Sequence, residues 1–234
     1  LILSACGGKD EHSSTEVALP GVQTETVSVA LPNTEGSQGL RDDSPRVILQ
    51  TERGPIVIAL FTDKAPETTR RFTANVKSGY YDNTVFHRVI ANLLIQGGAY
   101  TPQYQRKPDQ GFIRNEAANG LRNLRGTVAA ARRANDSESA GTQFFINVVD
   151  NPQFDYTGND DARTRGYTVF GAVVEGMDIV DGIRNEAVST KSGVGEYTPK
   201  TPVVILTARL QESKCNSVEQ MRPVSTPYAP EETS

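Results

Sequence analysis

VFHRVIANLLIQGG, residues 85–98, sets aromatic and branched apolar residues around one arginine and one glutamine. Residues of these apolar types favour β-structure, so they predict one strand over residues 84–90. A second strand is predicted over residues 93–96, after a connection of two residues. This pattern differs from an ordinary core strand because it also carries polar groups suited to binding.

The alternation of side chains along a strand predicts which residues share a face. On the first strand Arg88 is expected to lie with Phe86, and His87 on the opposite face. On the second strand Leu94 is expected to lie with Gln96. If the two strands are neighbours, a guanidinium, an amide and apolar side chains share one surface patch.

The later segment TQFFINV, which begins at Thr142, repeats this logic. Gln143 and Phe145 are predicted to share one face, while Phe144 and Ile146 share the other. One face can then fill the core while the other carries a site. Between the two segments, the small residues of GTVAAARR would let a bound chain approach the backbone closely.

Five motifs together carry a family resemblance: APETTRRF, FHRVI…QGG, GTVAAAR, GTQFFIN and YTVFGAVVEGMDIVD. In this order they resemble the cyclophilin family of peptidyl-prolyl cis-trans isomerases, in its bacterial form. The resemblance runs from about Arg46 to Leu210. It implies a closed eight-stranded antiparallel β-barrel capped by two α-helices, with substrate bound on the outer surface.

The residues themselves agree with a mainly β architecture. A helix is expected after Thr62 or Asp63, either of which can cap it, with Pro66 in its first turn and Gly79 at its end. A closed antiparallel barrel suits such a chain because closure removes exposed strand edges. The other predicted elements are strands 46–51, 55–61, 168–174 and 203–210, a helix at 176–185, and loops at 99–123, 147–166 and 189–202.

The residue types argue against nucleophilic and metal chemistry. The sequence has two histidines, and we interpret His87 as a hydrogen-bonded structural residue, with His12 in a tail. Cys6 and Cys215 lie outside the predicted domain, and no His, Cys, Asp and Glu spacing resembles a metal site, so we expect neither a metal nor a cofactor. Prolyl isomerisation needs neither, because the enzyme need only bind the twisted amide better than the planar forms.

The resemblance implies a role for each matching residue. Arg88 would donate a hydrogen bond to the prolyl nitrogen as the amide twists, and Gln96 would hold a neighbouring carbonyl. Phe145 would form the proline pocket, giving three catalytic positions in all. The expected substrate-binding positions are Leu93 and Leu94 in that pocket, Ala131, Arg132 and Gln143 beside the residue before proline, and Phe154 and Tyr167 on the rim.

Two departures from the family pattern keep an alternative open. Leu93 and Leu94 stand where the family usually has Phe and Met, so the chain could be a peptide-binding module or chaperone with weak or no turnover. Phe154 and Tyr167 replace the tryptophan and histidine of animal members, which predicts weak cyclosporin binding. The intact Arg88 favours the isomerase.

The flanks differ from the domain in charge. Residues 1–45 carry a net charge of −5 and residues 211–234 carry −2, which leaves +3 for residues 46–210. We expect a flexible acidic tether over residues 6–45 and a disordered tail over residues 211–234, because such composition does not repay the cost of ordering. No strong basic stripe suggests nucleic-acid binding, and we expect a monomer that binds proline-containing polypeptides.

The sequence LSAC, which ends at Cys6, resembles a bacterial lipobox. On this interpretation residues 1–5 are the remnant of a signal peptide, and Cys6 carries the lipid. The alternative is an accidental apolar stretch. Lipidation would make the protein an extracytoplasmic, membrane-anchored lipoprotein acting on exported proteins, and Gly7 favours the outer membrane of a diderm bacterium.

Overall fold

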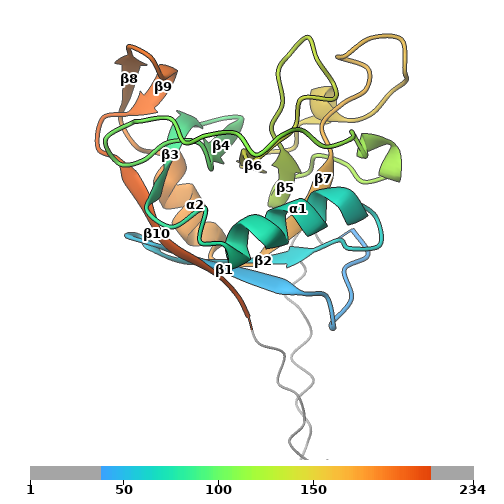
Figure 1. The fold of residues 1–234 in the computed structure, drawn as a ribbon, viewed down its shortest axis with the longest axis horizontal. Helices are drawn as coiled ribbons and strands as arrows, with labels where there is room; N and C mark the ends of the chain where they lie inside the picture. The colour runs from blue at the N-terminus through green and yellow to red at the C-terminus, as the bar shows by residue number, and fades with distance from the viewer. Residues whose placement is uncertain (1–37, 212–234) are drawn as a thin grey trace, which may run out of the picture. The chain divides into compact units, whose positions relative to one another are not determined.

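Eight strands close into a barrel in the order β1-β10-β3-β4-β6-β5-β7-β2, and every neighbouring pair is antiparallel. The computed structural model describes residues 38–211, drawn in colour in Figure 1. The strands are β1 Arg46–Thr51, β2 Gly54–Leu60, β3 Thr84–Ile90, β4 Leu94–Gly97, β5 Thr127–Ala130, β6 Phe144–Asn147, β7 Val169–Glu175 and β10 Val203–Leu210.

Two α-helices pack against the barrel: α1, Pro66–Lys77, and α2, Met177–Arg184. Phe72 of α1 is buried against the rings of Tyr81, Phe144 and Phe170, at centroid distances of 5.2, 5.6 and 5.0 Å. Such aromatic packing adds to the energy of burial alone. The predicted fold class, a closed eight-stranded barrel with two helices, is therefore confirmed.

The cap of α1 differs from the prediction. Its N-cap residue is Ala65, which makes no side-chain capping bond, so Thr62 and Asp63 do not cap the helix. Instead the carboxylate of Glu116 accepts hydrogen bonds from the backbone N–H groups of Glu67 and Thr68, at 3.1 and 2.9 Å. A carboxylate from a distant segment thus satisfies the free N–H groups at the positive end of the helix.

The predicted loop at 189–202 is wrong, because this segment forms an antiparallel hairpin outside the barrel. Its strands are β8, Val188–Lys191, and β9, Gly195–Pro199. In Figure 1 the hairpin rises beside β3 at one end of the barrel, while the loop 155–166 rises at the other. Most of its residues are exposed, so the segment lacks the apolar alternation that marks a half-buried strand. Two short 3₁₀ turns, Ala117–Asn119 and Pro152–Phe154, lie in the predicted loops.

Contacts with the barrel begin before the predicted domain start. The backbone oxygen of Arg122 accepts a hydrogen bond from Gln38 Nε2 at 2.7 Å, and Arg122 N–H donates to Gln38 Oε1 at 2.8 Å. Leu40 packs against two apolar clusters of the barrel. The boundaries of the tether and tail stay predictions, and Cys6, His12 and Cys215 lie outside the described residues.

Neither α-helix of the described region is long and apolar enough to cross a bilayer. Within residues 38–211, no group of three or more His, Cys, Asp and Glu side chains is arranged to hold a metal ion.

Candidate active site

A cavity of about 630 Å³ opens on the outer face of the barrel, over β3, β4 and β6 and beside the end of β5. Its floor follows from strand alternation, because Phe144 and Ile146 point into the barrel while Phe145 points out into the cavity. All ten residues predicted as catalytic or substrate-binding line it: Arg88, Leu93, Leu94, Gln96, Ala131, Arg132, Gln143, Phe145, Phe154 and Tyr167. Their roles stay predictions.

A β-bulge in β3 overturns one predicted face. Phe86 pairs with Gly97, but Arg88 pairs with Gln96, so His87 is an extra residue on its strand. Phe86 lies in the barrel interior, whereas His87 and Arg88 both line the cavity. The predicted pairing of Arg88 with Phe86 on one face is therefore wrong, because a bulge breaks the period-two alternation and turns the next side chain outward.

Arg88 is half-buried, and its guanidinium makes no hydrogen bond or ion pair with another residue of the described region. On the neighbouring strand, Gln96 Nε2 donates to Gln143 Oε1 at 2.9 Å. This bond fixes the two amides beside each other across β4 and β6. Gln143 also hydrogen-bonds the side chain of His87, so the groups left to bind a ligand are the guanidinium donors of Arg88 and the remaining amide groups of Gln96.

Three aromatic rings build the apolar end of the cavity. The ring centroid of Phe145 lies 5.6 Å from those of Phe154 and Tyr167, and the centroids of the latter two lie 5.0 Å apart. All three pairs are edge-to-face. Leu93 and Leu94 pack against the same cluster. A compact apolar ring of about the size of proline would bury its surface here, next to the donors of Arg88.

The guanidinium of Arg132 is directed to the neighbouring loop. Its Nε donates to the Gly166 carbonyl at 3.0 Å, its Nη1 donates to the Arg133 carbonyl at 2.9 Å, and its Nη2 donates to the Ala162 carbonyl. Its central carbon also lies 4.2 Å from the centroid of the Tyr167 ring. Arg132 therefore lines the cavity while holding the loop that precedes Tyr167.

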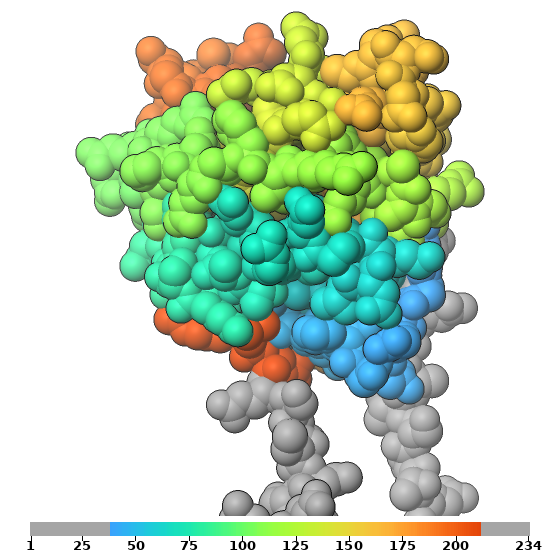
Figure 2. Space-filling view, turned by 45° about the vertical axis from the view of Figure 1, so that its right-hand side comes forward, coloured from blue at the N-terminus to red at the C-terminus, as the bar shows by residue number. Residues whose placement is uncertain are grey.

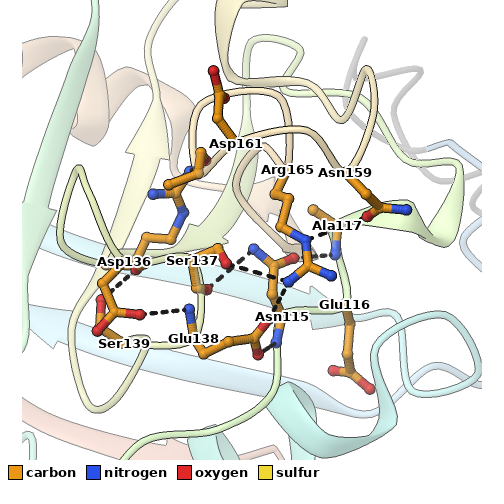
Figure 3. Close-up of polar contacts among 12 residues, drawn as sticks. Asn115, Glu116, Ala117, Asp136, Ser137, Glu138, Ser139, Asn159, Asp161 and Arg165 are labelled. Carbon is orange, nitrogen blue, oxygen red and sulfur yellow. Dashed lines mark hydrogen bonds and ion pairs between the residues drawn. The ribbon is translucent and has the colours of Figure 1, made fainter.

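A polar network joins that loop to the segment 133–139, as Figure 3 shows. Arg165 Nη1 donates to Glu138 Oε1 at 2.8 Å, and Arg165 Nε donates to Asn159 Oδ1 at 3.3 Å. The other carboxylate oxygen of Glu138 accepts from the backbone N–H of Asn115 at 2.8 Å. Because these residues come from three separate segments, the network connects the loops behind the aromatic end of the cavity.

His87 is buried and remains neutral at physiological pH. Burial is the largest cause that lowers its pKa, from 6.5 to about 4, and the positive charge of Arg88 acts in the same direction. Its ring lies 4.8 Å from that of Tyr100, and its Nδ1 has no hydrogen-bond partner in the described region. Hydrogen bonds to the backbone of Val85 and to the side chain of Gln143 act in the opposite direction on the pKa, so the prediction of a hydrogen-bonded structural histidine holds, with Nδ1 left unpaired.

Sequence reasoning missed one wall of the cavity. Val194, Gly195, Glu196 and Tyr197 of the β8–β9 hairpin and its turn line the space next to Arg88. The turn residues Ser192 to Gly195 marked only a loop, so nothing in the local pattern indicated that this segment would stand at the site.

Comparison with known proteins agrees with this geometry. The family described as cyclophilin type peptidyl-prolyl cis-trans isomerase/CLD matches residues 46–210. Peptidyl-prolyl cis-trans isomerase B of Escherichia coli is 45% identical over 166 residues, covering 71% of this chain and 99% of that protein. Peptidyl-prolyl cis-trans isomerase cyp18 of Streptomyces antibioticus is 48% identical over 165 residues, covering 70% and 97%.

Among solved structures, a cyclophilin-type isomerase of Cryptosporidium parvum, crystallised in the presence of the dipeptide Ala-Pro, superposes with a TM-score of 0.60. It is 24% identical, and the match covers 72% of this chain and 99% of that one. This likeness supports the fold. The family match and the two bacterial relatives show that the chain belongs to the cyclophilin-type peptidyl-prolyl cis-trans isomerases.

Proposed function

We propose that the cavity isomerises X-Pro bonds by non-covalent catalysis, with Arg88 as the hydrogen-bond donor. Rotation about a peptide bond has a barrier of about 18–20 kcal/mol because amide resonance is lost. As the bond twists, the prolyl nitrogen regains its lone pair and becomes a better acceptor. A donor fixed beside that nitrogen therefore binds the transition state more strongly than either planar form.

One observation carries this proposal: the guanidinium of Arg88 has no partner within the described residues, and it borders an aromatic pocket in the same cavity. The pocket built on Phe145 would hold the proline ring and exclude water. Gln96, fixed by its bond to Gln143, would bind a neighbouring substrate carbonyl. Arg88, Gln96 and Phe145 are thus the proposed catalytic residues.

Exchange NMR on an X-Pro peptide tests the mechanism directly. Arg88→Ala is expected to lower kcat/KM by about 100-fold, as loss of one preorganised donor does in other enzymes. Arg88→Lys keeps the charge but loses the planar fork, so we expect only partial rescue. The matched control is Arg70→Ala, at an exposed position on α1. Unchanged turnover in Arg88→Ala would refute the role of Arg88.

Leu93 and Leu94 favour a second candidate function. Both pack beside Phe145, where leucine supplies no aromatic face against a proline ring. A peptide-binding module or chaperone would bind proline peptides in this pocket without useful acceleration. If the wild type binds but does not isomerise, and Leu93→Phe with Leu94→Met restores turnover, the binding module is the correct function.

We further propose that the protein assists the folding of exported proteins while anchored through a lipid on Cys6. The lipobox-like LSAC sequence and Gly7 support anchoring in the outer membrane of a diderm bacterium. Labelling with an alkyne fatty acid in a bacterial host should mark the wild type and Cys215→Ser, but not Cys6→Ser. Label that persists in Cys6→Ser, or a protein recovered only in the cytoplasm, would contradict this location.

A further inference from the structure

The β8–β9 hairpin forms one wall of the cavity and adds a carboxylate and an aromatic ring to it. Val194, Gly195, Glu196 and Tyr197 line the same space as Arg88. This wall stands next to β3, whereas Phe154 and Tyr167 pack against Phe145 of β6. A polypeptide bound at Arg88 would therefore meet the hairpin with residues that flank its proline.

The hairpin is held in place by tyrosines of the segment 99–105. Tyr104 Oη donates to the Pro199 carbonyl at 2.8 Å, and Tyr100 Oη donates to the Gly193 carbonyl at 3.5 Å. Val194 packs against the apolar cluster that contains Tyr100. In Figure 2 the hairpin (orange) and the loop 155–166 (gold) stand apart along the upper rim. The wall is therefore anchored to the same surface that carries the cavity.

Tyr197 is exposed in an unusual backbone conformation. Its φ is +61°, in the left-handed region that bulky residues rarely adopt, and the residue is 43% exposed. Backbone strain of this kind is retained where the surrounding structure requires it, and it is common at binding sites. Here the conformation places the exposed ring of Tyr197 at the edge of the cavity.

Glu196, the residue before Tyr197, supplies a carboxylate to the same wall of the cavity. It is exposed and makes no hydrogen bond or ion pair with another residue in the described part of the chain. Of the other ionisable residues on the cavity wall, His87 is neutral, whereas Arg88 and Arg132 are cationic, and Arg132 has its donors bound to backbone carbonyls. A carboxylate and an aromatic ring on one cavity wall are suited to a lysine or arginine side chain, which gains an ion pair from the first and a cation–π contact from the second.

We propose that the β8–β9 hairpin is a specificity subsite that favours client segments with Lys or Arg close to the isomerised proline. Glu196 pairs with the cation, and Tyr197 packs against its stem or its charged head. The inference rests on the proposed function of the cavity, because the subsite acts on a chain already bound at Arg88.

A position scan with peptides tests the subsite. Otherwise identical X-Pro peptides carry Lys, Ala or Glu at each of the three positions before and after proline, and exchange NMR gives kcat/KM for each. At one position or more, we expect Lys to exceed Glu by about three- to tenfold for the wild type, the size of an exposed ion pair with a cation–π contact.

Variants of the hairpin assign that preference to its source. Glu196→Gln should reduce the Lys-to-Glu ratio towards one, and Glu196→Lys should invert it. Tyr197→Asn should weaken it while tolerating the left-handed backbone. The matched control is Glu175→Gln, at an exposed carboxylate outside the cavity, which should leave the ratio unchanged.

The outcomes separate this inference from the proposed function. Isomerisation without any position that prefers Lys, or a preference that survives in Glu196→Lys, overturns the subsite and leaves the isomerase intact. If the wild type turns over no peptide, the proposed function fails. Calorimetry then gives the dissociation constants of the Lys and Glu peptides, and their ratio replaces the ratio of kcat/KM values. A Lys preference in binding that disappears in Glu196→Gln supports the subsite, and equal constants overturn it.

Discussion

At the scale of single residues, the site depends on which charges are already satisfied. Arg132 donates hydrogen bonds to the carbonyls of Gly166, Ala162 and Arg133, so few of its N–H groups remain available to a substrate. Arg88 has no such bonds within the described residues. A donor left free beside an apolar pocket keeps its hydrogen-bonding capacity for a ligand, where low local polarity strengthens the bond.

His87 is expected to make the free energy of unfolding depend on pH. Its pKa in the folded state is about 4, below its ordinary 6.5, because burial disfavours the charged ring. The contribution of neutral His87 to the free energy of unfolding is therefore fully present above pH 6.5 and is lost as the pH falls through 4. The complete loss amounts to about 3 kcal/mol. Urea unfolding at pH 7, 5.5 and 4.5 measures it.

The control for this prediction is His87→Phe, which keeps a ring against Tyr100 but cannot titrate. Groups that titrate elsewhere contribute equally to both proteins, so the difference between their pH profiles isolates His87. We expect the wild type to lose more stability than the variant between pH 6.5 and 4.5. Parallel profiles would show that the folded state accepts the charged ring without cost.

The same residue shows where prediction from sequence ends. Alternation correctly placed Gln96 with Leu94 and Gln143 with Phe145 in the cavity. It placed Arg88 wrongly relative to His87, because one extra residue in β3 shifts the register against β4. A bulge depends on the pairing of two strands, which the residues of one strand alone do not encode.

At the scale of elements, strongly amphipathic segments were predictable and segments that depend on distant partners were not. The strands β3 and β10 begin and end as predicted, at Thr84–Ile90 and Val203–Leu210. The hairpin β8–β9 was missed because its stability depends on Tyr100 and Tyr104, far away in the chain. The cap of α1 was missed for the same reason, since Glu116 follows the helix by about 40 residues.

Glu116 is expected to stabilise the fold through the N-terminus of α1. Its two oxygens accept from the N–H groups of Glu67 and Thr68, and from Thr68 Oγ1 at 2.7 Å. Glu116→Gln keeps the size but removes the charge and one acceptor, so it should cost about 1 to 2 kcal/mol. Denaturant unfolding measures the loss, and the control Asp160→Asn, at an exposed carboxylate in a loop, should cost less than about 0.5 kcal/mol. Equal losses would refute the capping role.

Arg132 is expected to act as a positioning residue for the loop 155–166. Arg132→Lys keeps the charge but loses the fork that binds several carbonyls, each bond worth about 1 kcal/mol. We expect faster hydrogen exchange in the loop and a KM raised by about three- to tenfold with a smaller change in kcat, because the rim at Phe154 and Tyr167 is loosened before substrate binds.

The neighbouring residue provides the control for Arg132. The guanidinium of Arg133 lies over the ring of Phe112, 4.9 Å from its centroid, and neither residue lines the cavity. Arg133→Lys should therefore leave exchange in the loop 155–166 unchanged. Unaltered exchange in Arg132→Lys, or a loss confined to kcat, would show that Arg132 does not act through the loop.

At the scale of the whole molecule, the site is assembled by the barrel's strand order. Gln96 and Gln143 meet because β4 and β6 are neighbours, although 46 residues separate the two glutamines in sequence. Local periodicity predicts strands but not their order in a closed sheet. The family resemblance predicted a closed eight-stranded barrel but not this strand order, and the hairpin wall and the bulge required the folded chain.

Because one cooperative barrel carries the whole cavity, a bound proline peptide should stabilise the entire fold. A peptide at 100 times its dissociation constant adds about 2.7 kcal/mol to the free energy of unfolding when it binds the folded state alone. For a domain of this size that raises Tm by about 5 to 10 °C. Thermal unfolding with an X-Pro peptide, and with the same peptide carrying alanine for proline, measures the effect. Stabilisation should require proline and should be lost in Phe145→Ala, which removes the floor of the pocket. An equal rise with the alanine peptide would mean that the cavity recognises extended backbone and not the proline ring.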